Sequence, residues 1–181
     1  ELERRTVYTI LSKPIPRWSF VVGKYAGLIL TLTAQLVLMV LFYIVLMLVE
    51  PQQIFPPPVV FVSMFMVLLE LMLLTAWATL FSCYSAPTTA AFFTVSIFVI
   101  GHVADDVWLY GSQAESLHVR QIARTLYWVL PNFEIFNIRE AAVHHREVPW
   151  DRLWQSAAYG LAYTGVVLGC AVSIFQRKDI K

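Results

Sequence analysis

The sequence predicts an all-α integral membrane protein with four transmembrane helices, and three observations lead to this prediction. Hydrophobic residues make up 59% of the 181 residues and charged residues only 14%, against about 45–50% and about 25% in soluble domains. The mean hydropathy is +0.66. Long runs with almost no charge alternate with polar connections that contain proline. A soluble domain of this length could not bury so much apolar surface, so the lipid bilayer is the expected solvent.

The first two predicted spans cover residues 18–49 and 59–81. The stretch Leu28–Val49 carries no charge. At 1.5 Å per residue, this stretch alone is long enough to cross about 30 Å of hydrocarbon. Three prolines, Pro56 to Pro58, precede the second span, and proline favours the first turn of a helix. Both runs are therefore predicted to cross the membrane completely.

The third and fourth predicted spans cover residues 88–104 and 153–175. The third begins after Pro87 and ends before Asp105; it is short and could extend to Tyr110. The fourth stops at a polar cluster and is rich in residues small enough for close helix packing in lipid. These are Ala157, Ala158, Gly160, Ala162, Gly165 and Gly169. The alternative for each span is a buried helix of a soluble protein. The length of the other three spans argues against this alternative, and the shorter third span argues against it less.

Basic residues divide unevenly between the two sides that four spans would create. Eight of the 13, including every lysine, fall on the side of the two chain ends. They are Arg4, Arg5, Lys13, Arg17, Lys24, Arg177, Lys178 and Lys181. The other side has five arginines diluted by eight acidic residues. Because cytoplasmic loops carry an excess of Lys and Arg, we expect both ends in the cytoplasm and residues 107–152 outside.

The segment 107–152 has a helical pattern of its own. Apolar residues recur on one side of the stretch from Leu117 to Leu130, while Arg120 and Arg124 fall on the other. This period predicts an amphipathic helix that lies in, or dips into, the outer leaflet and ends at Pro131. A second short helix is predicted around residues 134–144.

One carboxyl group falls in the middle of a predicted span. Glu70 has apolar neighbours, and no Lys or Arg lies in any span except Lys24, near the start of the first. A carboxyl at that depth is costly, so it is either functional or paired. Gln35 of the first span lies at a similar depth, and a Gln35–Glu70 hydrogen bond between neighbouring helices is the structural interpretation that we favour. A role in carrying a proton or contacting cargo is the alternative.

Two groups of residues have the atoms to bind a metal ion. One is His102 with Asp105 and Asp106, and the other is His144 and His145 with Glu147. Neither spacing matches a familiar zinc pattern, so we predict no metal site. The sequence also lacks a Gly-rich phosphate loop followed by Lys-Ser/Thr, which predicts that the chain binds no nucleotide. We expect it to bind no cofactor. No basic patch carries interleaved aromatic residues, so nucleic acid is not an expected partner.

Three stretches of the sequence resemble one transporter family. The first stretch combines Thr6, Leu11-Ser12, Pro14, Arg17, Phe20 and Gly23-Lys24. The second is LPNFEIFNIREA at 130–141, and the third is the ending IFQRKDIK. Together they resemble the type 2 ABC exporter permeases, which include the gliding-motility and nitrous-oxide-reductase-maturation permeases. Arg5 departs from the pattern, because many relatives carry Gly there.

The resemblance implies a multi-pass permease subunit of an ATP-driven ABC exporter in the inner (plasma) membrane. A separate ATPase subunit would dock on a coupling segment, residues 1–17, and a second permease copy or homologue would complete the pathway. The docking residues implied are Glu3, Arg4, Arg5, Thr6, Leu11, Pro14 and Arg17. Relatives usually have two more membrane helices upstream, so residues 1–181 are expected to be the C-terminal part of one permease domain.

Two other classes of protein remain as alternatives. A non-transporting membrane anchor needs no coupling segment, so the pattern from Thr6 to Lys24 argues against it. An intramembrane enzyme needs polar catalytic groups that converge inside the membrane. Only Gln35, Glu70, His102 and a few hydroxyl groups qualify, which disfavours that class.

Overall fold

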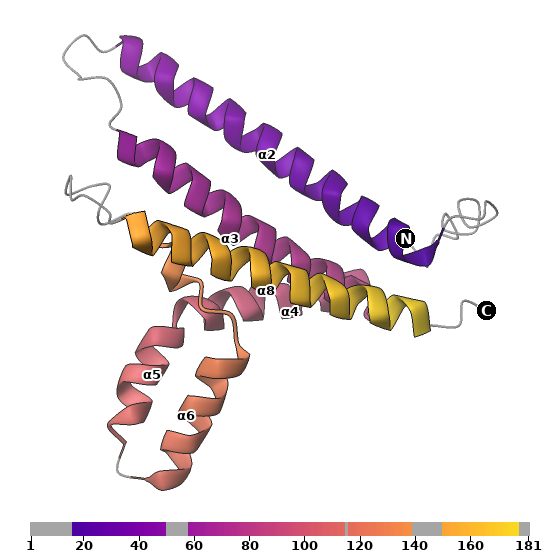
Figure 1. Ribbon diagram of the computed structural model, residues 1–181, viewed down its shortest axis with the longest axis vertical. Helices are drawn as coiled ribbons and strands as arrows, with labels where there is room; N and C mark the ends of the chain where they lie inside the picture. The colour runs from indigo at the N-terminus through magenta and orange to yellow at the C-terminus, as the bar shows by residue number, and fades with distance from the viewer. Residues whose placement is uncertain (1–15, 50–57, 115, 139–149, 178–181) are drawn as a thin grey trace.

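The protein is a bundle of long helices from which a helical hairpin projects (Figure 1). The computed structural model describes residues 16–49, 58–114, 116–138 and 150–177, and all regular structure within these ranges is helical. Helices α2 (Arg17–Val49), α3 (Pro58–Ser82) and α8 (Trp150–Arg177) are each long and apolar enough to cross a membrane. These helices confirm the predicted all-α membrane fold.

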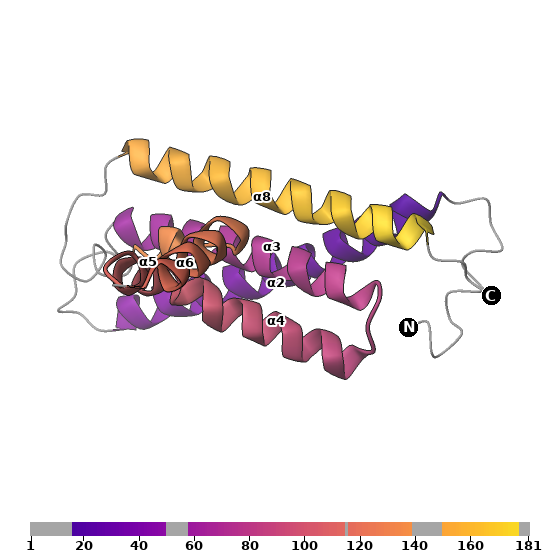
Figure 2. The ribbon, with the colours of Figure 1, turned by 90° about the horizontal axis from the view of Figure 1, so that it is seen from below.

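The bundle has two distinct ends. Figures 1 and 2 place the start of α2 and the end of α8 together at one end, which we call the Arg17 end. At this end the Arg17 guanidinium donates a hydrogen bond to the Gln176 carbonyl, Nη1 to O, at 3.4 Å. The end of α2 and the starts of α3 and α8 lie at the opposite end, which we call the Trp150 end.

At the Arg17 end, α2, α3 and α8 pack directly on one another. We call this cluster the three-helix core; its buried residues are Val21, Tyr25, Ala76, Leu80, Cys83, Val167, Ala171 and Phe175. The rings of Phe20 and Phe175 stack across α2 and α8 with centroids 5.7 Å apart. Alanine at positions 76 and 171, both fully buried, allows the helix backbones to approach closely, as is typical of helix contacts in lipid.

The predicted third span is a broken helix. Helix α4 (Pro87–His102) starts with proline in its first turn and ends beside the middle of α3, where His102 meets Glu70. Its 16 residues extend about 24 Å, which is less than the hydrocarbon thickness. Helix α5 (Ala104–Ser112) follows at an angle of 53°. The span predicted at 88–104 is therefore not one straight helix, and only the bent pair together has the length and composition of a span.

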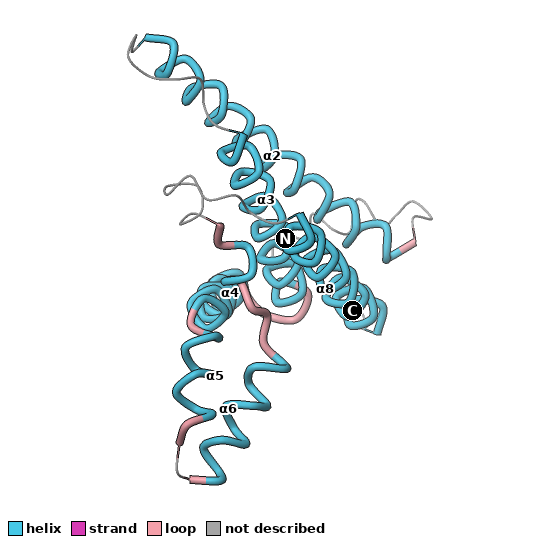
Figure 3. Tube along the Cα trace, turned by 60° about the vertical axis from the view of Figure 1, so that its left-hand side comes forward, coloured by secondary structure: helices cyan, strands magenta, loops and turns pink. Residues whose placement is uncertain are grey.

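Helices α5 and α6 (Leu117–Val129) form the hairpin that stands away from the bundle (Figure 3). Gly111 on α5 lies directly against Ala123 on α6, so the two helices touch without large side chains between them. Helix α6 confirms the predicted amphipathic helix. It ends at Val129, and the backbone of the next residue, Leu130, is extended, because Pro131 disfavours a helical conformation in the residue before it.

After the hairpin the chain returns into the bundle as the 130–138 segment, which includes only one turn of 3₁₀ helix, η1 (Glu134–Phe136). Of the short helix predicted at 134–144, the described part contains this single 3₁₀ turn and no longer helix; residues 139–144 lie outside the described ranges. The segment is nonetheless buried: Phe133 is 0% exposed and Phe136 2%. It forms the 130–138 core with residues of α3 and α8, namely Met66, Leu69, Leu73, Leu153 and Ala157.

Candidate intramembrane polar site

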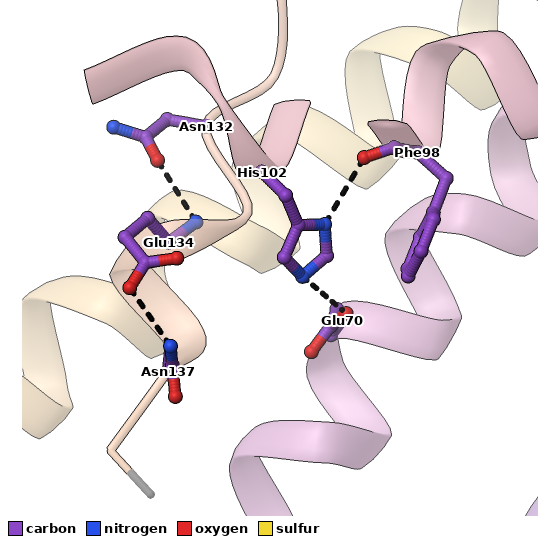
Figure 4. Close-up of polar contacts among 6 residues, drawn as sticks. All are labelled: Glu70, Phe98, His102, Asn132, Glu134 and Asn137. Atoms are coloured by element: carbon purple, nitrogen blue, oxygen red, sulfur yellow. Dashed lines mark hydrogen bonds and ion pairs between the residues drawn. The ribbon is translucent and has the colours of Figure 1, made fainter. Parts of the chain in front are cut away.

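Glu70 and His102 form a polar pair inside the bundle. Glu70 lies at the middle of α3, and its Oε1 is 3.3 Å from Nε2 of His102 at the end of α4. Figure 4 shows the imidazole between this carboxyl and the backbone oxygen of Phe98, which is 3.0 Å from Nδ1. The rings of Phe98 and Phe133 lie against the imidazole, with centroids 4.4 and 5.6 Å away.

The Phe98 contact bears on which imidazole nitrogen carries a hydrogen. A carbonyl oxygen can only accept a hydrogen bond, so this contact favours the tautomer with a hydrogen on Nδ1. Nε2 then faces Oε1 of Glu70 and gives the carboxyl a polar partner inside the bundle. This arrangement removes most of the cost of placing a carboxyl among apolar side chains.

The 130–138 segment covers this pair and is itself held by polar contacts. The backbone N–H of Phe133 donates to the Gly101 carbonyl at 3.0 Å. The side chain of Asn132 donates to Asp105 Oδ1 at 2.6 Å and accepts from the Glu134 N–H at 2.9 Å. Irregular backbone inside a membrane protein is tolerated when its polar groups find protein partners, and these contacts supply several of the partners that this segment needs.

Helix α8 supplies the remaining contacts from one side. The Tyr159 hydroxyl accepts from the backbone N–H of Asn132 at 3.0 Å. Ser156 Oγ shares its proton between the Arg152 carbonyl within α8, at 2.9 Å, and the Ile135 carbonyl of the segment, at 3.2 Å. The Tyr163 hydroxyl donates to the carbonyl of Val129, just before the segment, at 2.9 Å. These three positions recur at helical spacing, so a single face of α8 holds the segment.

The structure gives Glu70 a different partner from the predicted one. Gln35 is exposed on α2, whereas Glu70 is paired with His102. The prediction overlooked histidine because only Lys and Arg were considered as cations within the spans. His102 and Glu70 are 32 positions apart, and neither lies in a recognisable motif, so no local pattern signals the pair.

The predicted ATPase-docking residues are almost all outside the described ranges. Glu3, Arg4, Arg5, Thr6, Leu11 and Pro14 lie there, and so do His144, His145 and Glu147. Arg17 is described, and it bridges the first turn of α2 to the last turn of α8.

Within the described residues, no group of three or more His, Cys, Asp or Glu side chains lies close enough to hold a metal ion. Asp105 is instead hydrogen-bonded to Asn132. His102 faces Glu70 and the Phe98 carbonyl.

A comparison with protein-family models matches residues 1–180 to the model described as ABC-2 family transporter protein. The chain belongs to this family. It is therefore a membrane permease subunit of an ABC transporter, a class that associates with an ABC ATPase. The comparisons with curated proteins and with solved structures returned no match.

In this permease, the resemblance noted for residues 130–141 falls largely on the segment that covers the Glu70–His102 pair. The sequence placed that segment outside the membrane helices, and the described part of it lies in the interior of the bundle. Hydrophobic periodicity in the sequence could not reveal this burial. An irregular segment whose backbone is held by hydrogen bonds to side chains has no repeating pattern of apolar and polar residues.

Proposed function

We propose that this permease couples ATP hydrolysis by a separate ATPase subunit to export, and that two permeases together form the pathway. Family membership over residues 1–180 is the observation that carries the proposal. The ATPase docks on the coupling segment, residues 1–17, in the cytoplasm. ATP binds to the partner, since the 181 residues contain no phosphate-binding loop of the Walker type.

The contacts at the Arg17 end support this coupling. The coupling segment leads directly into α2, whose first turns contact α8 through the Arg17–Gln176 hydrogen bond and the stacked rings of Phe20 and Phe175. A displacement of the coupling segment would therefore act on both helices. Helix α8 in turn holds the 130–138 segment through Ser156 and Tyr159, so the movement could reach the far half of the bundle.

Charge reversal in the coupling segment tests the docking. We expect Arg4→Glu with Arg5→Glu to weaken co-purification of the ATPase at ordinary salt without affecting membrane insertion, because charge at a surface contact changes and no apolar burial is lost. Arg120→Glu with Arg124→Glu, on the exposed face of α6, is the matched control and should retain the partner. Wild-type yield of the ATPase with the Arg4/Arg5 variant would remove these residues from the interface.

Cysteine labelling tests the orientation. With both ends cytoplasmic, an impermeant thiol reagent added to intact cells should modify a cysteine placed at Ser112 or His145 and should miss one placed at Ser12. Modification of the Ser12 position from outside would contradict the orientation.

A further inference from the structure

A polar cavity of about 510 Å³ lies between α5, the 130–138 segment and the first half of α8. Its volume is within the range of small-molecule sites. Charged or hydrogen-bonding side chains from all three elements line it, among them Asp105, Glu134, Arg152, Gln155, Ser156 and Tyr159. Asp105, Arg152 and Gln155 are exposed and Glu134 and Tyr159 are half-buried, so the charged groups of this cavity are accessible to a ligand from solvent.

The described residues that line the cavity carry charges of both signs, and these charges do not form ion pairs with one another. Among the described residues, Arg152 forms no ion pair with Asp105 or Glu134. Asp105 uses Oδ1 to accept from Asn132, and Glu134 uses Oε1 to accept from Asn137 at 2.8 Å. With respect to the described residues, each carboxylate therefore keeps one oxygen for a ligand, and the guanidinium keeps its donors.

Tyr159 adds a donor to the same cavity. Its hydroxyl oxygen accepts the Asn132 N–H, which leaves the hydroxyl proton for a further acceptor. The described lining of the cavity thus combines two carboxylate residues, one on α5 and one on η1, with an arginine and a tyrosine on α8.

We infer that this cavity binds the zwitterionic group of the compound that the permease moves: an ammonium group at Asp105 and Glu134, and a carboxylate or phosphate at Arg152 and Tyr159. A simple anion would be repelled by the two carboxylates, and a metal cation would be repelled by the guanidinium. Neither ligand is therefore complementary to all three charges. The ligand is either a free zwitterion or a lipid headgroup such as phosphoethanolamine. Its assignment as cargo rests on the proposed transport function; its binding does not.

Cysteine protection tests the binding. The complete transporter, with Cys170→Ala and Gln155→Cys, is placed in nanodiscs of phosphatidylglycerol, a lipid without an ammonium group. We expect a cationic methanethiosulfonate reagent to modify the Gln155 position about tenfold faster than an anionic one, because the described lining residues include two carboxylates and one arginine. Glycerophosphoethanolamine at ten times its dissociation constant should slow the modification roughly tenfold.

Isosteric variants and matched probes assign the effect to the cavity. Asp105→Asn with Glu134→Gln keeps the hydrogen bonds to Asn132 and Asn137 but should abolish both the reagent preference and the protection. Glycerol 3-phosphate, which lacks the ammonium group, should protect poorly. A cysteine at Leu161, exposed on α8 outside the cavity, should show no protection. Equal rates for both reagents without protection, or equal protection by glycerol 3-phosphate, would overturn the inference.

Two further measurements separate the source and the role of the ligand. Protection in phosphatidylethanolamine nanodiscs without added compound identifies a lipid headgroup, and its absence there identifies a soluble zwitterion. ATP hydrolysis by the complex should rise with the ligand in the parent protein and not in the Asp105/Glu134 variant. Protection without that rise would overturn the cargo assignment. Because labelling needs no ATP, failure of ATPase docking leaves the binding result intact.

Discussion

The two ends of the bundle are built in different ways. The three-helix core at the Arg17 end consists of helices in direct contact, with alanine where their backbones approach and aromatic rings at the margin. In the 130–138 core, an irregular segment is inserted between α3 and α8, and its backbone is held by side chains from α8 and by α4. One end therefore depends mainly on packing, and the other depends on packing and on polar groups that must all be satisfied.

This difference bears on how the permease could move. Helices in lipid can slide or tilt on small residues with little change in hydrogen bonding. A segment fastened by specific donors and acceptors has fewer alternative positions, since each displaced polar group would be left unpaired. We therefore expect the 130–138 core to switch between discrete arrangements and the three-helix core to adjust gradually.

The largest expected effect comes from closing the space at Gly101. A methyl group there would lie 2.7 Å from the Pro131 carbonyl oxygen and 2.8 Å from Phe133 Cε2, and Phe133 is fully buried. Gly101→Ala should lower the free energy of unfolding by about 1–3 kcal/mol through overpacking. Gly165→Ala, at an open position on α8, should be neutral or slightly stabilising. Thermal unfolding in detergent compares the two, and equal midpoints would show that the close approach at Gly101 does not constrain the core.

A smaller effect is expected from the Tyr159 hydroxyl. Tyr159→Phe leaves the buried N–H of Asn132 without its acceptor, which should cost about 1–2 kcal/mol. Tyr84→Phe, in the turn between α3 and α4 and about half exposed, should change the unfolding midpoint little. If the two variants are equally stable, the 130–138 segment does not depend on this contact with α8.

The smallest effect on stability is expected at Glu70. Glu70→Gln should be nearly silent, because the glutamine amide can donate to Nε2 of a neutral His102. Glu70→Leu leaves Nε2 without that donor, and the expected loss is about 1 kcal/mol or less, as for other hydrogen bonds between membrane helices.

The same two variants separate a structural role for Glu70 from a functional one. Transport and thermal stability are measured together for each. A structural role predicts that transport follows stability in both. Loss of transport in Glu70→Gln at unchanged stability would instead show that Glu70 carries a proton or contacts cargo.

The apolar spans and the amphipathic hairpin helix could be read from the sequence. Leu28–Val49 and the run after Pro58 are apolar over a length that is typical of a transmembrane helix. Arg120 and Arg124 share one face of α6, and the helix ends before Pro131, as proline chemistry requires. These features depend on composition, period and local backbone preference, which are properties of neighbouring residues.

The tertiary structure alone decided how the polar groups pair. Whether Glu70 meets Gln35 or His102 depends on where α4 ends, and α4 ends where the Gly101 carbonyl accepts the Phe133 N–H. That hydrogen bond joins residues 32 positions apart, and so does the Glu70–His102 contact. No local propensity encodes such contacts. They form because a carboxyl, an imidazole and an irregular backbone must find partners once water is excluded, and only the packed arrangement of α3, α4 and α8 determines which partners are within reach.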